Sequence, residues 1–218
     1  MAYPTVDGPY GFRPINLIGG QVFAGQTRSI PIASGSTTAI FFGDVVRLNT
    51  GGTLSRVSTT TTATDAVGIF MGCQFTNPTT KQLLQQQYYP GAITASDITA
   101  FVADDPDGLF KVAVLSNSTT IGGLTQTDVG NNVSILTTAG STTSGDSNMG
   151  VLNSTSDSTT TLPFRIIAGV PETVNASGSF TEVIVKFNFG VHTYYSATPV
   201  ATAASGAIKW LCLVPNYL

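Results

Sequence analysis

Three aspartates, Asp104, Asp105 and Asp107, crowd into the stretch DDPDG. Clustered carboxylates can bind calcium or provide acid–base catalysis. A calcium loop needs oxygen ligands at alternating positions and usually a later bidentate glutamate, whereas Leu109 stands at the next alternating position and no glutamate follows nearby. The same residues suit a tight turn, because Asp accepts hydrogen bonds from nearby N–H groups, Pro fixes φ and Gly adopts positive φ. We therefore expect DDPDG to be a turn between two strands, without a metal or catalytic role.

The other residues capable of chemistry form no catalytic motif. The single histidine, His192, stands between an apolar strand and two tyrosines, which is typical of a hydrogen-bonded structural residue. The chain lacks the GxSxG motif of serine hydrolases, and its glycines form no phosphate-binding fingerprint. We predict no catalytic residue, no metal site and no cofactor.

The two cysteines, Cys73 and Cys212, lie far apart without a CxxC motif. With only one histidine in the chain, this arrangement excludes a conventional zinc site. Cys73 lies in an apolar run, where a thiol is normally inert. Their spacing leaves open whether the two cysteines pair, although a reducing cytoplasm favours free thiols.

Charged residues make up only 10% of the chain, against roughly 25% in ordinary soluble domains. Ser, Thr, Asn and Gln supply the polarity instead, and the net charge is −3. A surface with few charges produces little repulsion between copies, which suits a protein packed against neighbours; the plainer reading is a neutral, threonine-rich β protein. The nine Lys and Arg form no cluster that could neutralise phosphates, so we expect no nucleic-acid partner.

The N-terminal stretch MAYPTVDGPYGFRPINLIGG has no basic region followed by an apolar run, so it does not resemble a signal peptide. No apolar stretch reaches the roughly 20 residues needed to cross a bilayer. We expect a protein that is made and folded in the cytoplasm and has no membrane partner.

Residues 1–25 are rich in proline and glycine, with four aromatic residues among them. Proline removes backbone donors and glycine weakens regular structure, so we expect an extended arm. The aromatic side chains imply that this arm docks, either on its own domain or on a neighbouring subunit.

From Arg28 onward the pattern is that of short strands. The segments AIFFGDVVRL and TLSRV flank the glycine turn NTGG, and AVGIFMGCQF is long enough for a buried strand. The segment QLLQQQYY could form a short helix, but we favour the returning arm of a hairpin because the turn signal TNPTTK precedes it. In TEVIVKFNF, Val183, Val185, Phe187 and Phe189 alternate with Glu182, Ile184, Lys186 and Asn188, which predicts a strand with one buried face.

These patterns predict a mainly β fold of many short antiparallel strands, with a small β-barrel, β-tulip-like or sandwich core, an extended N-terminal arm and long loops. We place the arm at 1–25, the β domain at 26–195 and a C-terminal tail at 196–218. The Ser/Thr-rich block 116–161 is either an inserted subdomain or a set of long loops, with NVSIL and MGVLN as short strands.

The stretch FFGDVVRLNTGGTLSRV, followed by AVGIFMGCQF, resembles the core of the capsid decoration (cement) proteins of tailed bacteriophages. In those proteins a Gly-Asp pair precedes an apolar strand, as at 43–46, and a second strand carries glycine among apolar residues, as at 68–72. The layout is also similar to head structural proteins of phages that infect aquatic bacteria such as cyanobacteria. There an opening like GPYGFRPINLIGG precedes the Gly-Asp strand and a segment like YYPGAITASDITAFVADDPDGLFKVAV follows it. These pieces cover about residues 7–115, and TEVIVKFNFGVHTYY extends the similarity to Tyr195.

The resemblance implies a structural virion protein without enzymatic activity. Such a protein binds the outer surface of the icosahedral capsid, after assembly in the host cytoplasm, and cements neighbouring capsomers against internal DNA pressure. The implied partners are the major capsid protein and further copies of the chain, with a homotrimer favoured. Several weak contacts then reinforce one another, since each becomes intramolecular once the first has formed. Asp44 would start a strand and bond a turn, without chemistry.

We predict that the partner contacts lie in the two terminal segments, unless both segments pack on their own domain. The arm could order on contact with a partner, and the C-terminus offers large apolar side chains of the kind that dominate interfaces. The predicted interaction residues are Tyr10, Phe12, Arg13, Pro14, Trp210, Leu211 and Tyr217.

Two other functions compete with capsid decoration. The first is a tail or fibre protein that binds polysaccharide on the host surface. The second is a polysaccharide hydrolase, which would need two carboxylates at a fixed separation. Glu172 and Glu182 are the only glutamates, and the aspartates mostly stand in turn sequences. We therefore favour the structural role over both.

Overall fold

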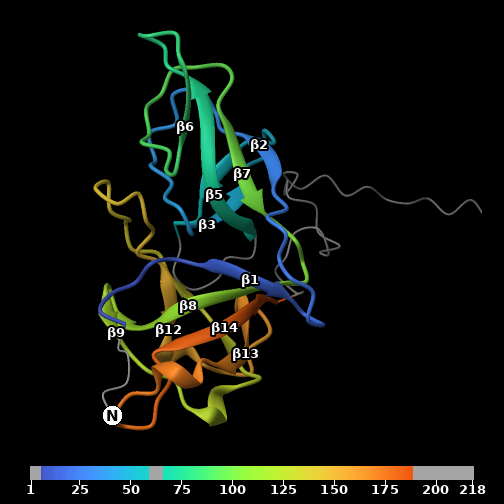
Figure 1. The fold of residues 1–218 in the computed structure, drawn as a ribbon, viewed down its shortest axis with the longest axis vertical. Helices are drawn as coiled ribbons and strands as arrows, with labels where there is room; N and C mark the ends of the chain where they lie inside the picture. The colour runs from blue at the N-terminus through green and yellow to red at the C-terminus, as the bar shows by residue number, and fades with distance from the viewer. Residues whose placement is uncertain (1–5, 59–65, 189–218) are drawn as a thin grey trace, which may run out of the picture.

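The computed structural model describes residues 6–58 and 66–188. The fold is mainly β, with 44% strand and 5% helix, and comprises a nearly closed, barrel-like sheet and a second, antiparallel sheet. The two sheets follow one another along the long axis of the molecule (Figure 1). The predicted fold class is therefore confirmed. Within the described ranges no helix has the length and apolar character needed to span a bilayer.

The barrel-like sheet closes because one extended segment contributes to both of its ends. Strands β10 and β11 are separated only by Ser134, and they pair with β13 and β12 respectively. At this junction the Ser134 N–H and hydroxyl both donate to Thr155 Oγ1, at 3.1 and 3.0 Å. The strand order is β10 (Asn132–Val133), β13 (Phe164–Gly169), β14 (Glu182–Phe187), β8 (Gly108–Asn117), β12 (Gly150–Leu152) and β11 (Ile135–Leu136), with β1 (Arg13–Leu17) and β9 (Thr120–Ile121) also paired to β8.

The second sheet contains the two hairpins that the sequence predicts. Its order is β2 (Arg28–Pro31), β7 (Thr99–Ala103), β5 (Ala66–Thr76), β3 (Val45–Leu48) and β4 (Leu54–Arg56), with β6 (Leu83–Gln86) also paired to β5. The NTGG turn joins β3 to β4, and QLLQQQYY supplies β6 as a strand, not a helix. Three short 3₁₀ helices complete the described elements: η1 (Gln126–Asp128), η2 (Asn153–Thr155) and η3 (Pro171–Thr173).

Apolar burial joins the two sheets. The larger core cluster combines barrel residues with Val45, Ile69 and Ala103 of the second sheet, all at most 1% exposed. A smaller cluster, which includes Phe70 and Tyr89, lies within the second sheet. Because burial of apolar surface is the main favourable term in folding, the shared cluster fixes the sheets against each other.

The N-terminal arm packs on its own domain. Phe12 is fully buried, with its ring 4.7 Å from that of Phe164. Residues 13–17 form β1, which pairs antiparallel with β8. At Gly11, φ is 78° and a Cβ atom would lie only 2.6 Å from Ser147 Cβ, so the close approach of the arm requires glycine. The sequence left open whether the arm docks on its own domain or on a neighbouring subunit. In the described structure the arm packs on its own domain.

The Ser/Thr-rich block 116–161 is an integral part of the barrel. It supplies β9 to β12, and it buries Leu124, Val133, Ile135, Met149 and Val151 in the larger cluster. Without this block the barrel could not close, so it is neither a separate subdomain nor only loops.

Both faces of β14 are more buried than the alternating pattern predicts. Val183, Val185 and Phe187 are buried as expected, but Glu182 and Lys186 on the opposite face are also only 5% and 7% exposed. The expectation of one exposed face was wrong because β14 is an inner strand between β13 and β8. Phe189 lies outside the described residues.

Candidate functional site

The DDPDG segment is a turn, as the sequence predicts, and it connects β7 to β8 and thus one sheet to the other. The Asp105 carboxylate accepts from Asp107 N at 2.8 Å, and Gly108 N donates to Asp105 O at 3.0 Å. Asp104 pairs with Arg28 at 2.9 Å and Asp107 pairs with Lys186 at 2.7 Å. These carboxylates therefore hold the turn and its neighbours in place.

No group of three His, Cys, Asp or Glu side chains that could hold a metal ion occurs within residues 6–58 and 66–188. Burial raises the pKa of Asp104, and the Arg28 charge acts in the opposite direction. His192 and Cys212 fall outside the described ranges. Cys73 is buried, and its thiol lies 3.7 Å from the carbonyl oxygen of Tyr88.

Asp44 lies in the interior and joins three segments. Its carboxylate accepts hydrogen bonds from Phe41 N at 2.8 Å, Arg56 Nε at 3.0 Å and Ser147 Oγ at 2.6 Å. Burial raises the pKa of Asp44, and the Arg56 charge is the strongest opposing influence. Because Asp44 is 0% exposed, its carboxylate cannot meet a ligand from solvent. Its geometry is that of a structural residue that bonds a turn.

Tyr10 covers a second buried carboxylate. Its hydroxyl donates a hydrogen bond to Glu182 Oε1, and Lys111 Nζ lies 3.4 Å from the same oxygen. Burial raises the pKa of Tyr10 well above its ordinary value, and the adjacent Glu182 acts in the same direction. The hydroxyl therefore stays protonated and remains a donor to Glu182.

Arg13 lies on the surface beside this cluster, but it is fixed in place. Its guanidinium group pairs with Asp146 at 2.6 Å and lies 4.3 Å from the ring centroid of Phe42. Gln87 donates to the same Asp146 oxygen at 2.9 Å. The Arg13 side chain is 27% exposed, so part of it could contact a partner.

The structure therefore separates the residues proposed for binding. Phe12 is a core residue with no exposed surface, whereas Tyr10, Arg13 and Pro14 are half-buried. The predicted C-terminal contacts, Trp210, Leu211 and Tyr217, lie outside the described residues.

An apolar turn that we did not single out from the sequence follows directly after β1. In this apolar turn (residues 17–23), Leu17 N donates to Gln21 O at 2.8 Å. Ile18 is 46% exposed and Val22 is 76% exposed, while Phe23 packs against the larger core cluster. A pocket of about 190 Å³ lies between this turn and Asp105. In the sequence, the signal for this turn was the pair of glycines in LIGGQVF, which has apolar residues on both sides.

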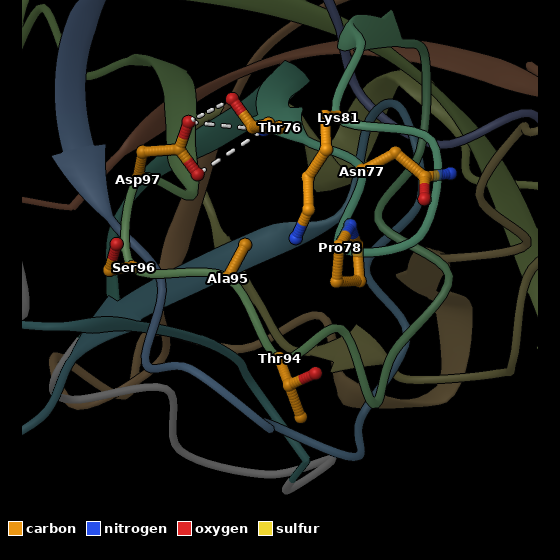
Figure 2. A pocket seen from close by; sticks show the side chains of 8 residues that line it. All are labelled: Thr76, Asn77, Pro78, Lys81, Thr94, Ala95, Ser96 and Asp97. Atoms are coloured by element: carbon orange, nitrogen blue, oxygen red, sulfur yellow. Dashed lines mark hydrogen bonds between the residues drawn. The ribbon is translucent and has the colours of Figure 1, made fainter.

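A polar pocket of about 400 Å³ lies at the end of the second sheet that is farther from the barrel. It lies between the β5–β6 hairpin and the segment before β7 (Figure 2). The Lys81 side chain points into the pocket, above Pro78 and Ala95. On the opposite side, the Asp97 carboxylate accepts hydrogen bonds from Thr76 N and Thr76 Oγ1. The pocket thus presents a cation and a carboxylate to solvent.

No protein-family model matches the chain, and no curated protein or solved structure is significantly similar to it. The geometry described above is that of a β protein whose inner carboxylates stabilise the fold. Two of its exposed features are the apolar turn and the polar pocket.

Proposed function

We propose that the chain is a structural virion protein that binds the outer surface of an icosahedral capsid and cements neighbouring capsomers. The location on a capsid is proposed because the ordered sequence pieces resemble phage decoration proteins. The apolar turn is the observation that carries the proposal, because it offers a contact surface on a firmly held part of the molecule.

The apolar turn is held from both sides. Before it, β1 pairs with β8, and Ile18 N donates to Asp107 O at 2.8 Å. After it, Phe23 packs on the larger cluster. A surface that is already ordered loses little conformational entropy on binding. Full burial of an exposed aliphatic side chain contributes roughly 1.5–3 kcal/mol, and Ile18 and Val22, at 46% and 76% exposed, would each supply a part of that on binding a shell protein.

The charges of the domain support the same role. Ion pairs among the described residues include Arg13–Asp146, Arg28–Asp104, Arg56–Asp44, Lys111–Glu182 and Lys186–Asp107. The charged fraction is already low, so little net charge remains to repel adjacent copies on a crowded lattice. In a trimer, three apolar turns could engage the shell together and strengthen the attachment by multivalency.

The decisive measurement is the copy number of the chain in purified virus particles, relative to the major shell protein, by quantitative mass spectrometry. We expect near-parity, as for a protein that covers the capsid lattice. A small fraction of the shell count would overturn the proposal and favour the tail or fibre protein that binds host polysaccharide.

The contact surface itself can be tested on particles that lack the chain. The double variant Ile18→Ser/Val22→Ser should bind these particles at least about tenfold more weakly, since the loss of one buried aliphatic contact suffices for that factor. Leu83→Ser is the matched control, because Leu83 is also exposed, at 64%, but lies on β6. Unchanged binding of the double variant would show that the apolar turn is not the contact.

A further inference from the structure

We propose that the polar pocket at the end of the β5–β6 hairpin binds a uronic acid unit of an acidic polysaccharide, with Lys81 on the sugar carboxylate and Asp97 on its hydroxyl groups. This site is separate from the apolar turn, and the inference does not depend on the proposed capsid role. The hairpin forms one end of the long axis, with the barrel at the other (Figure 1).

Lys81 supplies an unused positive charge. Its side chain has no ion pair or hydrogen bond with the described residues, whereas Lys111 and Lys186 pair with carboxylates. Lys81 also has a φ of 61°, in the left-handed region that favours glycine. The turn enforces this conformation, because Lys81 N donates to Asn77 O at 2.9 Å and Asn77 Oδ1 accepts from Thr79 N at 2.8 Å.

Asp97 supplies an oriented acceptor on the facing wall. The Thr76 hydroxyl donates to it at 2.6 Å, and Thr76 N lies 3.1 and 3.2 Å from its two oxygens. The Thr76 hydroxyl, followed by its N–H, lowers the pKa of Asp97, a group that is ionised near neutral pH even at its ordinary pKa. Hydrogen bonds to an ionised acceptor are stronger than those between neutral groups. Asp97 is thus prepared to accept further hydroxyl donors from solvent or from a ligand.

Lys81 and Asp97 form no ion pair with each other, so the two charges of the pocket do not cancel. A ligand that satisfies both must carry an anion and hydrogen-bond donors on one small frame. Thr94 and Ser96 also line the pocket with hydroxyl groups, while Pro78 and Ala95 provide apolar contacts (Figure 2). These are the complementary groups for a uronic acid, which has one carboxylate, adjacent hydroxyls and apolar C–H faces.

Other small ligands match the pocket less well. A neutral hexose would leave the Lys81 ammonium unpaired, and a simple carboxylate such as acetate would leave Asp97 unused. A free amino acid could pair with both charges, but it would not use the hydroxyl groups of the wall. The pocket opens at an end of the molecule, which suits one unit of a longer chain.

The test is a calorimetric titration of the full chain with galacturonate, galactose, acetate and alanine. We expect galacturonate to bind with a dissociation constant of about 1 mM, as for a few exposed polar contacts. Galactose and acetate should bind at least about tenfold more weakly, because each lacks one of the two matched interactions. Acetate or alanine that binds as well as galacturonate, or no galacturonate binding at about 10 mM, would overturn the proposal.

Substitutions in the pocket test whether galacturonate binds there. Lys81→Met and Asp97→Asn should each weaken galacturonate binding at least about fivefold, by loss of one charge-assisted contact. Lys111→Met is the matched control, because it removes the same charge from β8 and should bind as the natural chain does. Circular dichroism would establish that all variants are folded. Equal affinity of Lys81→Met and the natural chain would refute the site.

Discussion

The Asp44 carboxylate accepts a hydrogen bond from Arg56 Nε at 3.0 Å, with Asp44 fully buried and the Arg56 side chain only 12% exposed. The Ser147 hydroxyl donates to the same carboxylate at 2.6 Å. One buried charge therefore connects the turn before β3, strand β4 and the segment before β12. The Ser147 hydrogen bond holds part of the Ser/Thr-rich block against the second sheet.

Replacement of Asp44 should test this connection. The variant Asp44→Asn leaves the Arg56 charge in the interior without its partner, and we expect the free energy of unfolding to fall by about 3–5 kcal/mol. Urea unfolding followed by circular dichroism measures the change. Asp7→Asn, at an exposed position, should have no comparable effect. A loss below about 1 kcal/mol for Asp44→Asn would show that the ion pair contributes little.

Tyr10→Phe should destabilise the chain by about 1–3 kcal/mol, because Glu182 loses a hydrogen-bond donor at a site only 5% exposed. The control is Tyr88→Phe, since the Tyr88 ring stacks on Phe41 and no described residue bonds its hydroxyl group. The control should change the free energy of unfolding by less than about 0.5 kcal/mol. Equal effects of the two variants would contradict the role assigned to the Tyr10 hydroxyl.

Alkaline pH should destabilise the fold through Cys73. Burial raises the pKa of Cys73 from 9.0 to about 12, so the native state retains a proton that the unfolded chain releases. This stabilisation is complete below pH 9 and is lost as the pH rises toward 12, by at most about 1.4 kcal/mol per pH unit. Tyr10 and Tyr89, whose pKa values burial also raises, act in the same direction.

Denaturant titrations between pH 8 and 11 would isolate the thiol contribution. Cys73→Ala should show a shallower decline above pH 9 than the natural chain, although its stability at neutral pH is lower because a cavity forms. The tyrosine contribution remains in the variant and serves as an internal reference. Identical slopes would mean that the thiol ionises equally well in the folded and unfolded states.

Lys81→Gly should stabilise the chain by about 0.5–1 kcal/mol, because glycine adopts a φ of 61° without the steric cost that lysine has there. Lys81→Ala keeps that cost and should give no gain. Thermal or urea unfolding of the two variants provides the comparison. If the glycine variant is not the more stable one, the backbone at residue 81 is not strained. The glycine variant should also lose galacturonate binding, which would separate stability from function at this position.

Local patterns were sufficient to predict most of the strands and turns, but not β1, which lies in the segment expected to be an extended arm, or the short β9. Apolar and β-branched runs gave β5, β7 and β8, and the glycines of NTGG gave the β3–β4 hairpin. DDPDG was predictable as a turn because Asp, Pro and Gly act there through their own backbone preferences and adjacent hydrogen bonds.

Long-range contacts decided the rest. Asp44 and Ser147 are separated by 103 positions, and Tyr10 and Glu182 by 172, so no local pattern could place them together. The sequence indicated a β protein with a docked arm, but only the tertiary structure showed which face of β14 was covered and that 132–136 closes the barrel. It also decided that Phe12 is a core residue and that Lys81 and Asp97 share a pocket. The physical reason is that the alternation along a strand specifies two faces, whereas strand pairing determines what covers each face.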